Sequence, residues 1–296
     1  MRLGVHVPIA GGLLEAVARA KRLQCTTMQI FSRSPRGGPA PKVPLEVLER
    51  FDTERRAADI APLAIHGPYI INLASPNAAM WKQSTALYEA EYARATAFQA
   101  DYLVTHVGSH RGEGEAAGVA RVANAVSRAL DSLRSSVMIL LENTAGSGQG
   151  LGYRFEQLAE IRAAVSGGDM HRRRVGICLD TAHLFAAGYA IHTEEGLAKT
   201  LAEFDQAVGR EHLKLIHLND SKVPFDSHVD RHWHIGEGCI GIDAFRRLVN
   251  HPMLREVPMV LETPKTTEAE DQRNLSTVRT LLHASTSSRG HRAVRV

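Results

Sequence analysis

Histidine and acidic residues stand at the ends of short apolar runs in this 296-residue sequence. Eight such runs can be distinguished. In chain order their last residues are His6, Phe31, His66, His106, Glu142, Asp180, His217 and Glu262. Seven of the eight are His, Asp or Glu, although 15 His and 32 Asp or Glu are only 47 of the 296 residues. Imidazole and carboxylate groups gathered without a thiolate suit Zn²⁺, with Mn²⁺ or Fe²⁺ as competitors.

Two further motifs add candidate ligands. DTAHLFAAGY places His183 three residues after Asp180, so its side chain can point back to the end of the same run. In DRHWHIGEG, Asp230, His232 and His234 alternate, and an extended segment would turn all three the same way. The spacing alone therefore does not select the ligand histidine. Roughly nine ligands at three or four per ion imply more than one metal, and carboxylates that bridge ions are typical of phosphodiester hydrolysis.

The apolar runs alternate with amphipathic stretches whose apolar residues recur every three or four positions, the helical period. This alternation, without a linker, predicts an α/β fold, a single (β/α)₈ TIM barrel over residues 1–284. A doubly wound sheet is the alternative, but the GxGxxG turn that would favour it does not follow the first expected strand. Active sites of such barrels lie at the C-terminal ends of the strands. The expected strands are 3–6, 27–31, 63–66, 102–106, 138–142, 175–180, 213–217 and 259–262.

Bulk composition limits the class of protein. Hydrophobic residues make up 44% of the chain, enough for a sizeable core, and a formal charge of +3 is too balanced to indicate nucleic-acid binding by itself. Three cysteines without paired spacing argue against a disulfide framework. No apolar segment has the length of a signal peptide core or a membrane span, so we expect a soluble, cytoplasmic protein. The polar, basic residues 285–296 are expected to form a disordered tail.

Six motifs together carry a resemblance to a known family. They are HGPYIINL, HVGSH, LENTAG, LDTAHLFAAGY, HLNDSK and DRHWHIGEG, in that order along the chain. The sequence resembles the endonuclease IV family of apurinic/apyrimidinic endonucleases, which are trinuclear-zinc TIM barrels of base-excision DNA repair. The resemblance implies an enzyme that hydrolyses the phosphodiester 5′ to an abasic site in double-stranded DNA, and we expect it to be a monomer. The implied products are a 3′-hydroxyl and a 5′-deoxyribose phosphate.

The resemblance also implies a division of the ligands among three zinc ions, with Mn²⁺ as an alternative at one site. It selects His232 rather than His234 as the ligand in DRHWHIGEG. Glu142 would bridge two ions and Glu262 would orient or deprotonate the attacking water, so these two are the expected catalytic residues. The first ion would be held by His66, His106 and Glu142, the second by Glu142, Asp180, His217 and Glu262, and the third by His183, Asp230 and His232.

Residues beside the ligands are candidates for DNA contact. Tyr69 and Ile70 follow His66 closely, and an aromatic next to an aliphatic residue matches the family's wedge for the gap left by a flipped-out nucleotide. Arg36 in FSRSPRGG matches the family's inserted arginine. Without the resemblance, the first two could equally be core residues and Arg36 a solvated loop charge. The glycines at 37 and 38, where the family often has a bulky residue, predict a more mobile loop.

Five other positions receive lesser roles. His6 is predicted to lie at the rim without binding metal, and His110 to contact phosphate rather than metal. His234 is predicted to lie behind the ligands or to face DNA. Gly236 and Gly238 are predicted to give backbone flexibility to the turn that leads out of the site.

Two other function classes stay open at this stage. A metal-dependent sugar isomerase or epimerase on a related TIM barrel would need one or two metals. It would have no use for His183, Asp230 and His232 together. A non-catalytic DNA-binding scaffold would have no reason to keep a complete set of carboxylate ligands, because buried carboxylates are costly without a metal.

Overall fold

The strands of this protein close into a barrel. The computed structural model describes residues 1–284. The barrel strands in this range are β1 (Leu3–Val5), β2 (Met28–Phe31), β3 (Leu63–His66), β4 (Tyr102–His106), β5 (Met138–Glu142), β6 (Val175–Asp180), β7 (Leu213–His217) and β10 (Met259–Leu261). They pair in parallel in the order β1-β10-β7-β6-β5-β4-β3-β2, and a bridge between His6 and Gln29 joins the two end strands. The predicted TIM barrel is confirmed, with every predicted strand within one residue of the observed one.

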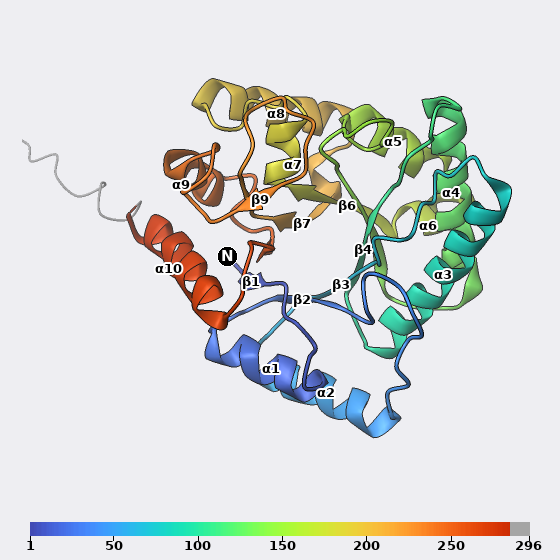
Figure 1. Cartoon of the computed structure of the whole chain (residues 1–296), viewed down its shortest axis with the longest axis horizontal. Helices are drawn as coiled ribbons and strands as arrows, with labels where there is room; N and C mark the ends of the chain where they lie inside the picture. The colour runs from blue at the N-terminus through green and yellow to red at the C-terminus, as the bar shows by residue number, and fades with distance from the viewer. Residues whose placement is uncertain (285–296) are drawn as a thin grey trace, which may run out of the picture.

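Helices follow the strands and surround the barrel (Figure 1). They are α1 (Leu13–Arg22), α2 (Leu45–Ala57), α3 (Ala78–Ala97), α4 (Glu115–Ser132), α5 (Phe155–Ala164), α6 (Gly168–Arg172), α7 (Thr181–Ala186), α8 (Glu194–Ala207), α9 (Ile242–Asn250) and α10 (Glu268–Ala284). A 3₁₀ turn covers Arg210–His212. In the described part of the chain, no helix combines the length and the apolar character that crossing a membrane requires. The predicted tail at 285–296 lies outside the described residues.

A layer of small and apolar side chains fills the barrel beneath its mouth. It consists of Ala64, Val104, Leu140, Cys178, Leu215 and Val260. Successive side chains of a strand point to opposite faces, so the residue two positions further along also points inward. Those residues are His66, His106, Glu142, Asp180, His217 and Glu262. The period of the strands therefore stacks the candidate ligands directly above this apolar layer, at the C-terminal mouth.

The long loop after β7 contains a short hairpin. In it, β8 (Asp220–Ser221) pairs antiparallel with β9 (His232–Trp233), with Ser221 opposite His232. Nε2 of His232 lies 3.4 Å from Oδ2 of Asp180 at the end of β6. The hairpin thus returns the DRHWHIGEG motif to the mouth of the barrel.

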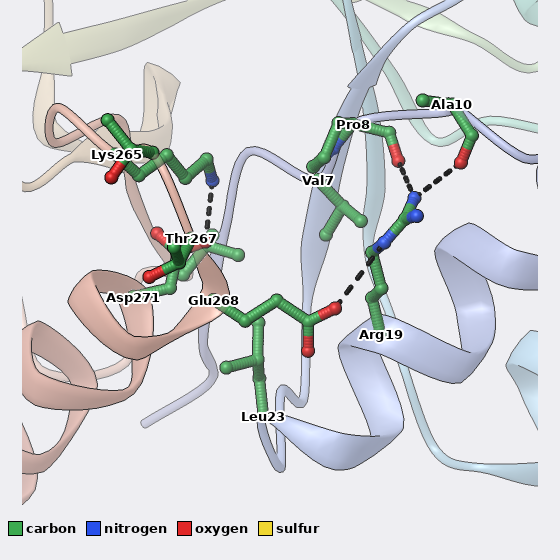
Figure 2. Close-up of a pocket in the computed structure, with 11 residues that line it drawn as sticks. Val7, Pro8, Ala10, Arg19, Leu23, Lys265, Thr267, Glu268 and Asp271 are labelled. Atoms are coloured by element: carbon green, nitrogen blue, oxygen red, sulfur yellow. Dashed lines mark hydrogen bonds and ion pairs between the residues drawn. The ribbon is translucent and has the colours of Figure 1, made fainter.

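Polar contacts join α10 to α1 and to Lys265 in the loop before α10 (Figure 2), and Lys265 in turn reaches the end of β1. Nζ of Lys265 donates to the main-chain oxygen of His6 at 2.6 Å and to Oδ2 of Asp271 at 2.7 Å. Nε of Arg19 lies 3.5 Å from Oε1 of Glu268. These side chains line a cavity of about 430 Å³ between the two helices. The contacts hold the loop after β10 against the end of β1.

Candidate metal centre and the rim above it

Three overlapping groups of His, Asp and Glu side chains lie at the mouth of the barrel. Within each group the ligand atoms lie within 4.8 Å of one another, close enough to share an ion. Strand register explains two of the contacts, because His106 pairs with Glu142 and Asp180 pairs with His217 on adjacent strands. Eight of the nine predicted ligands belong to these groups, and Asp230 lies beside the third.

The first group joins His66, His106 and Glu142. Oε2 of Glu142 lies 3.1 Å from Nε2 of His66 and 2.9 Å from Nε2 of His106. Nδ1 of His66 donates to the main-chain oxygen of Gly67 at 2.7 Å, which leaves Nε2 with its lone pair for a metal. Burial raises the pKa of Glu142, but the charges of His106 and His217 hold it well below its usual value.

The second group joins Glu142, Asp180, His217 and Glu262. Nδ1 of His217 lies 2.8 Å from Oε1 of Glu142 and 3.2 Å from Oε2 of Glu262. The side chains of Glu142, Asp180 and His217 are completely buried. Because Glu142 turns Oε2 toward the first group and Oε1 toward the second, its geometry suits a carboxylate that bridges two ions.

The third group joins Asp180, His183 and His232, so Asp180 belongs to this group as well as to the second. Oδ2 of Asp180 lies 3.4 Å from Nε2 of His232 and 4.0 Å from Nδ1 of His217, so Asp180 faces two groups rather than one. Asp230 stands at the outer edge, 3.2 Å from Nε2 of His183 and 3.3 Å from Nε2 of His232. Asp180 therefore has the geometry of a second bridging carboxylate.

The groups present at the mouth fit divalent cations. Nε2 of His183 and Nε2 of His232 are buried and make no hydrogen bond with any residue in the described range. Burial lowers the pKa of His183, but the carboxylates of Asp180 and Asp230 raise it to about 10. Burial raises the pKa of Asp230, yet the close approach and the charge of His183 hold it at about 2. So many carboxylates stabilise positive charge strongly, and metal ions would supply that charge.

Two asparagines orient the ligands, although the sequence alone assigned them no role. Nδ2 of Asn219 donates to Oδ2 of Asp180 at 2.6 Å, and its Oδ1 accepts the main-chain N–H of Glu262 at 2.7 Å. The main-chain oxygen of Asn143 accepts from Nδ1 of His183 at 2.9 Å. Oδ1 of Asn143 accepts the main-chain N–H of Asp180 at 2.6 Å. Their places one and two residues after ligands, in LENTAG and HLNDSK, were the signal that could have found them.

A buried aspartate in β8 anchors the loop that follows β9. The carboxylate of Asp220 accepts the main-chain N–H groups of Gly236, Gly238 and Ile240 at 2.9, 3.0 and 2.9 Å. A Cβ on Gly238 would lie 2.4 Å from the main-chain oxygen of Ser221, so this glycine permits a close approach of two backbones. The same carboxylate therefore holds both glycines in place, and the flexibility predicted for them stays a prediction.

Tyr69 and Ile70 form the rim beside the first group. They are 61% and 52% exposed, so they are not core residues. The ring centroid of Tyr69 lies 5.8 Å from that of His66 and 6.1 Å from that of His106. Both rim residues line a groove of about 570 Å³ that also contains His106 and His183. The groove therefore leads from the exposed pair to the metal-ligand groups.

Arg36 lies in the exposed loop between β2 and α2. Within the described part of the chain it makes no hydrogen bond or ion pair. A Cβ on Gly37 would lie 3.1 Å from Cδ1 of Ile70, so this loop passes directly beside the rim. At its start, Ser32 donates to the buried carboxylate of Glu91 at 2.5 Å. The guanidinium is thus carried on an anchored loop and is free to meet a ligand.

The three histidines that were predicted to have lesser roles all lie outside the metal-ligand groups. Nδ1 of His6 lies 3.1 Å from Oε1 of Glu262, behind the second group. Nδ1 of His234 meets Nδ2 of Asn274 at 3.1 Å, so this ring faces α10 and not the ligands. His110 accepts main-chain N–H groups of its own loop. Geometry therefore brings His232, and not His234, to the metal centre.

Gln29 lies among the metal-ligand side chains at the mouth of the barrel, and sequence reasoning missed it. Phe31 ends β2, as predicted, but the bridge between His6 and Gln29 puts Gln29 at the level of the ligands. Its side chain is completely buried and touches Glu262 and His217. A glutamine in an otherwise apolar strand was the available signal. The sequence does not show how far neighbouring strands are staggered, so it could not place Gln29 at the same height in the barrel as the ligands.

Comparisons with known proteins agree with this geometry. Residues 17–281 match the family model described as a xylose isomerase-like TIM barrel. The chain is 44% identical over 95% of its length to the "Probable endonuclease 4" of Chloroflexus aurantiacus, of which 98% is covered. The crystal structure of endonuclease IV from Thermus thermophilus matches with a TM-score of 0.85 and 35% identity, over 96% of this chain and 100% of that one.

Fold and site thus define a metal-dependent enzyme of the xylose isomerase-like TIM barrels. A D-tagatose 3-epimerase-like protein also matches, with a TM-score of 0.69 over 97% of this chain and 99% of that one. Its identity is only 17%, which shows a common fold and no more. Within this class, the chain belongs to the endonuclease IV family.

Proposed function

We propose that this chain is an apurinic/apyrimidinic endonuclease that hydrolyses the phosphodiester 5′ to an abasic nucleotide in double-stranded DNA. The products would be a 3′-hydroxyl and a 5′-deoxyribose phosphate, as base-excision repair requires. The observation that carries the proposal is the exposed pair Tyr69 and Ile70 beside three joined metal-ligand groups. Membership of the family makes the chain a DNA-cleaving hydrolase. We further propose that it acts as a monomer in the cytoplasm.

Three zinc ions per chain are the proposed cofactor, with Mn²⁺ as an alternative at one position. Nitrogen and oxygen donors without thiolate support zinc. Bound ions supply Lewis acidity toward the phosphate and lower the pKa of a nearby water. The residues that would hold them are His66, His106, Glu142, Asp180, His183, His217, Asp230, His232 and Glu262. Elemental analysis should give close to three ions per chain, and one per chain would contradict this assignment.

The carboxylates of the chain do the positioning and the proton transfer in this proposal. Glu262 would orient the attacking water and accept its proton, while Asn219 holds its main-chain N–H at 2.7 Å. Glu142 offers one oxygen to each of two groups and so sets their separation. The side chain of Glu142 is completely buried and that of Glu262 only 12% exposed, so both are held in place before substrate arrives.

Selection of damaged DNA is assigned to the rim. An abasic nucleotide is cheaper to flip out of the duplex than an intact one, because it has no base to unpair or unstack. The groove beside Tyr69 and Ile70 would receive it, and these two side chains would fill the gap that it leaves. Arg36, free of protein partners in the described range, would contact the DNA next to them.

Incision of duplex DNA that carries one tetrahydrofuran residue tests the proposal. Tetrahydrofuran lacks the aldehyde that β-elimination needs, so its cleavage separates a hydrolase from a lyase. We expect a cut on the 5′ side that leaves a 3′-hydroxyl, is lost after chelation and returns with zinc. The matched undamaged duplex should stay whole. Failure of the zinc-loaded protein to cut, or equal cutting of both duplexes, would contradict the proposal.

The second candidate is a metal-dependent sugar isomerase or epimerase, and the shared barrel fold is the observation that favours it. It leaves the third ligand group and the exposed Tyr69 and Ile70 without a role. Incubation of the zinc- or manganese-loaded protein with a ketose such as D-tagatose separates the two. We expect no epimer to form. Epimerisation together with an intact tetrahydrofuran duplex would reverse the assignment.

A further inference from the structure

Gln29 on β2 contacts two ligands of the second group, Glu262 and His217, across the place where β1 and β2 meet to close the barrel. Its Nε2 lies 2.6 Å from Oε1 of Glu262, and its Oε1 lies 2.9 Å from Nε2 of His217. Nε2 also lies 3.0 Å from Nδ1 of His6. The side chain has no exposed surface. Its amide thus uses both its donor and its acceptor ends on residues of the metal centre.

The direction of these hydrogen bonds follows from the chemistry of the partners. A carboxylate only accepts hydrogen bonds, so the atom of Gln29 that faces Glu262 must be the NH₂ group. The carbonyl oxygen of Gln29 then faces Nε2 of His217, and that nitrogen must carry hydrogen. With the Nε2–H group directed at Gln29, Nδ1 of His217 faces Glu142 and Glu262 at 2.8 and 3.2 Å, and it is the nitrogen whose lone pair would bind a metal. The amide therefore decides which nitrogen of His217 can bind metal.

Three other ligand histidines are oriented by the main chain instead. Nδ1 of His66 donates to Gly67 O at 2.7 Å, Nδ1 of His183 to Asn143 O at 2.9 Å, and Nδ1 of His232 to Glu262 O at 3.2 Å. Each of these rings presents Nε2 to its group. Among the four, His217 alone presents Nδ1 and alone depends on a side chain for its tautomer.

We propose that Gln29 is a positioning residue of the metal centre: it sets the tautomer of His217 and the orientation of Glu262. It thereby raises the affinity of the second group for metal. The proposal deepens the function proposed above and rests on it only for the presence of metal. Partners that orient a ligand histidine in this way typically contribute about 10–100-fold to metal affinity.

Gln29→Met tests the proposal, because methionine keeps the length of the side chain and removes both polar ends. Zinc affinity is measured by competition with a chromophoric chelator, and ring tautomers by ¹⁵N–¹H correlation spectra of histidine-labelled protein. We expect the tightest zinc equivalents to weaken by about 10–100-fold. We also expect the signal of His217 to lose its Nε2–H pattern, while those of His66 and His183 stay unchanged.

Two further variants make the result specific. Gln157→Met is the matched control, because Gln157 is also buried and accepts the main-chain N–H of Gly152 at 2.8 Å, away from the ligands. It should leave zinc affinity and the tautomer unchanged. Gln29→Glu keeps an acceptor toward His217 and should keep the Nε2–H pattern even where affinity falls.

The outcomes separate this inference from the proposed function. Wild-type zinc affinity and an unchanged His217 signal in Gln29→Met would overturn it. So would an equal loss in Gln29→Met and Gln157→Met, which would indicate packing alone. These measurements need no DNA. If the wild-type protein left tetrahydrofuran DNA uncut, the proposed function would fail while the role of Gln29 in zinc binding would stand.

Discussion

Glu142, Asp180 and His217 have no exposed surface, whereas Tyr69 and Ile70 at the neighbouring rim are 61% and 52% exposed. The ligands are held from several directions, by side-chain amides, by main-chain groups and by one another. The rim residues have their backbone in place but leave their side chains free to meet another molecule. The buried region is therefore organised by the protein itself, whereas the exposed side chains of the rim are free to be ordered by a bound molecule.

The difference has a physical reason. Carboxylates that lie close together repel one another, and only a rigid surround keeps them at the separation that metal ions require. A rim that enters a duplex, as proposed above, would instead have to adapt to DNA that is bent and unstacked locally. Substitutions of the buried ligands should therefore change metal content or the rate of hydrolysis. Substitutions of the rim residues should change the recognition of DNA and leave metal content unchanged.

The sharpest test on the buried side is Glu262→Gln. The amide keeps the shape of the side chain but cannot accept a proton in the same way, so kcat for tetrahydrofuran incision should fall by about 10²–10⁴-fold. Circular dichroism should show an intact fold. Glu237→Gln is the control, since Glu237 is exposed and pairs with Arg273 away from the ligands. A Glu262→Gln enzyme with more than a tenth of wild-type kcat would remove this residue from catalysis.

Within DRHWHIGEG, His232→Ala and His234→Ala should differ in metal content. His232 contributes Nε2 to the third group, so its removal should cost one metal equivalent per chain. His234 faces Asn274 and should cost none. Elemental analysis after dialysis against a weak chelator checks both. Equal metal loss in the two variants would contradict the assignment of His232.

At the rim, the double change of Tyr69 and Ile70 to alanine should weaken recognition and preserve the metal centre. Loss of aromatic stacking is worth about 1–3 kcal/mol, so kcat/KM for tetrahydrofuran DNA should fall by roughly 5–150-fold. Because both side chains are exposed, stability should change by less than about 0.5 kcal/mol per site. Metal loss comparable to that of His232→Ala would contradict the separate roles proposed for the buried ligands and the exposed rim residues.

The smallest effect is expected for Arg36→Ala. An exposed arginine that contacts phosphate contributes mainly electrostatic affinity, so DNA binding should weaken a few-fold and uniformly across sequences. The slope of log affinity against log salt should decrease by about 1 in magnitude. Fluorescence anisotropy at several salt concentrations measures it, with Arg210→Ala on the far 3₁₀ turn as control. An unchanged salt slope would remove Arg36 from the DNA contact.

Several features were predictable because they depend on local periodicity. Strand residues alternate between two faces, so His66, His106 and Glu142 were bound to point the same way as the apolar residues two positions before them. Parallel strands joined by helices bring their C-terminal ends to one mouth. Those two rules, applied to the pattern of the chain, predicted the barrel and the neighbourhood of the ligands.

Other features depended on how remote strands are staggered, which no local pattern carries. Gln29 lies at the height of the ligands because it pairs with His6, where β1 and β2 meet to close the barrel. Its strand, β2, continues for two residues beyond it. Asp180 faces two groups because the β8–β9 hairpin returns His232 to it. Asp220 in β8 accepts the main-chain N–H groups of the two glycines that follow β9. The sequence by itself determined which side chains gather at the mouth, because their spacing is local. Only the closed barrel decided which of them lie together in one group and which amide contacts them, because those contacts join strands far apart in the chain.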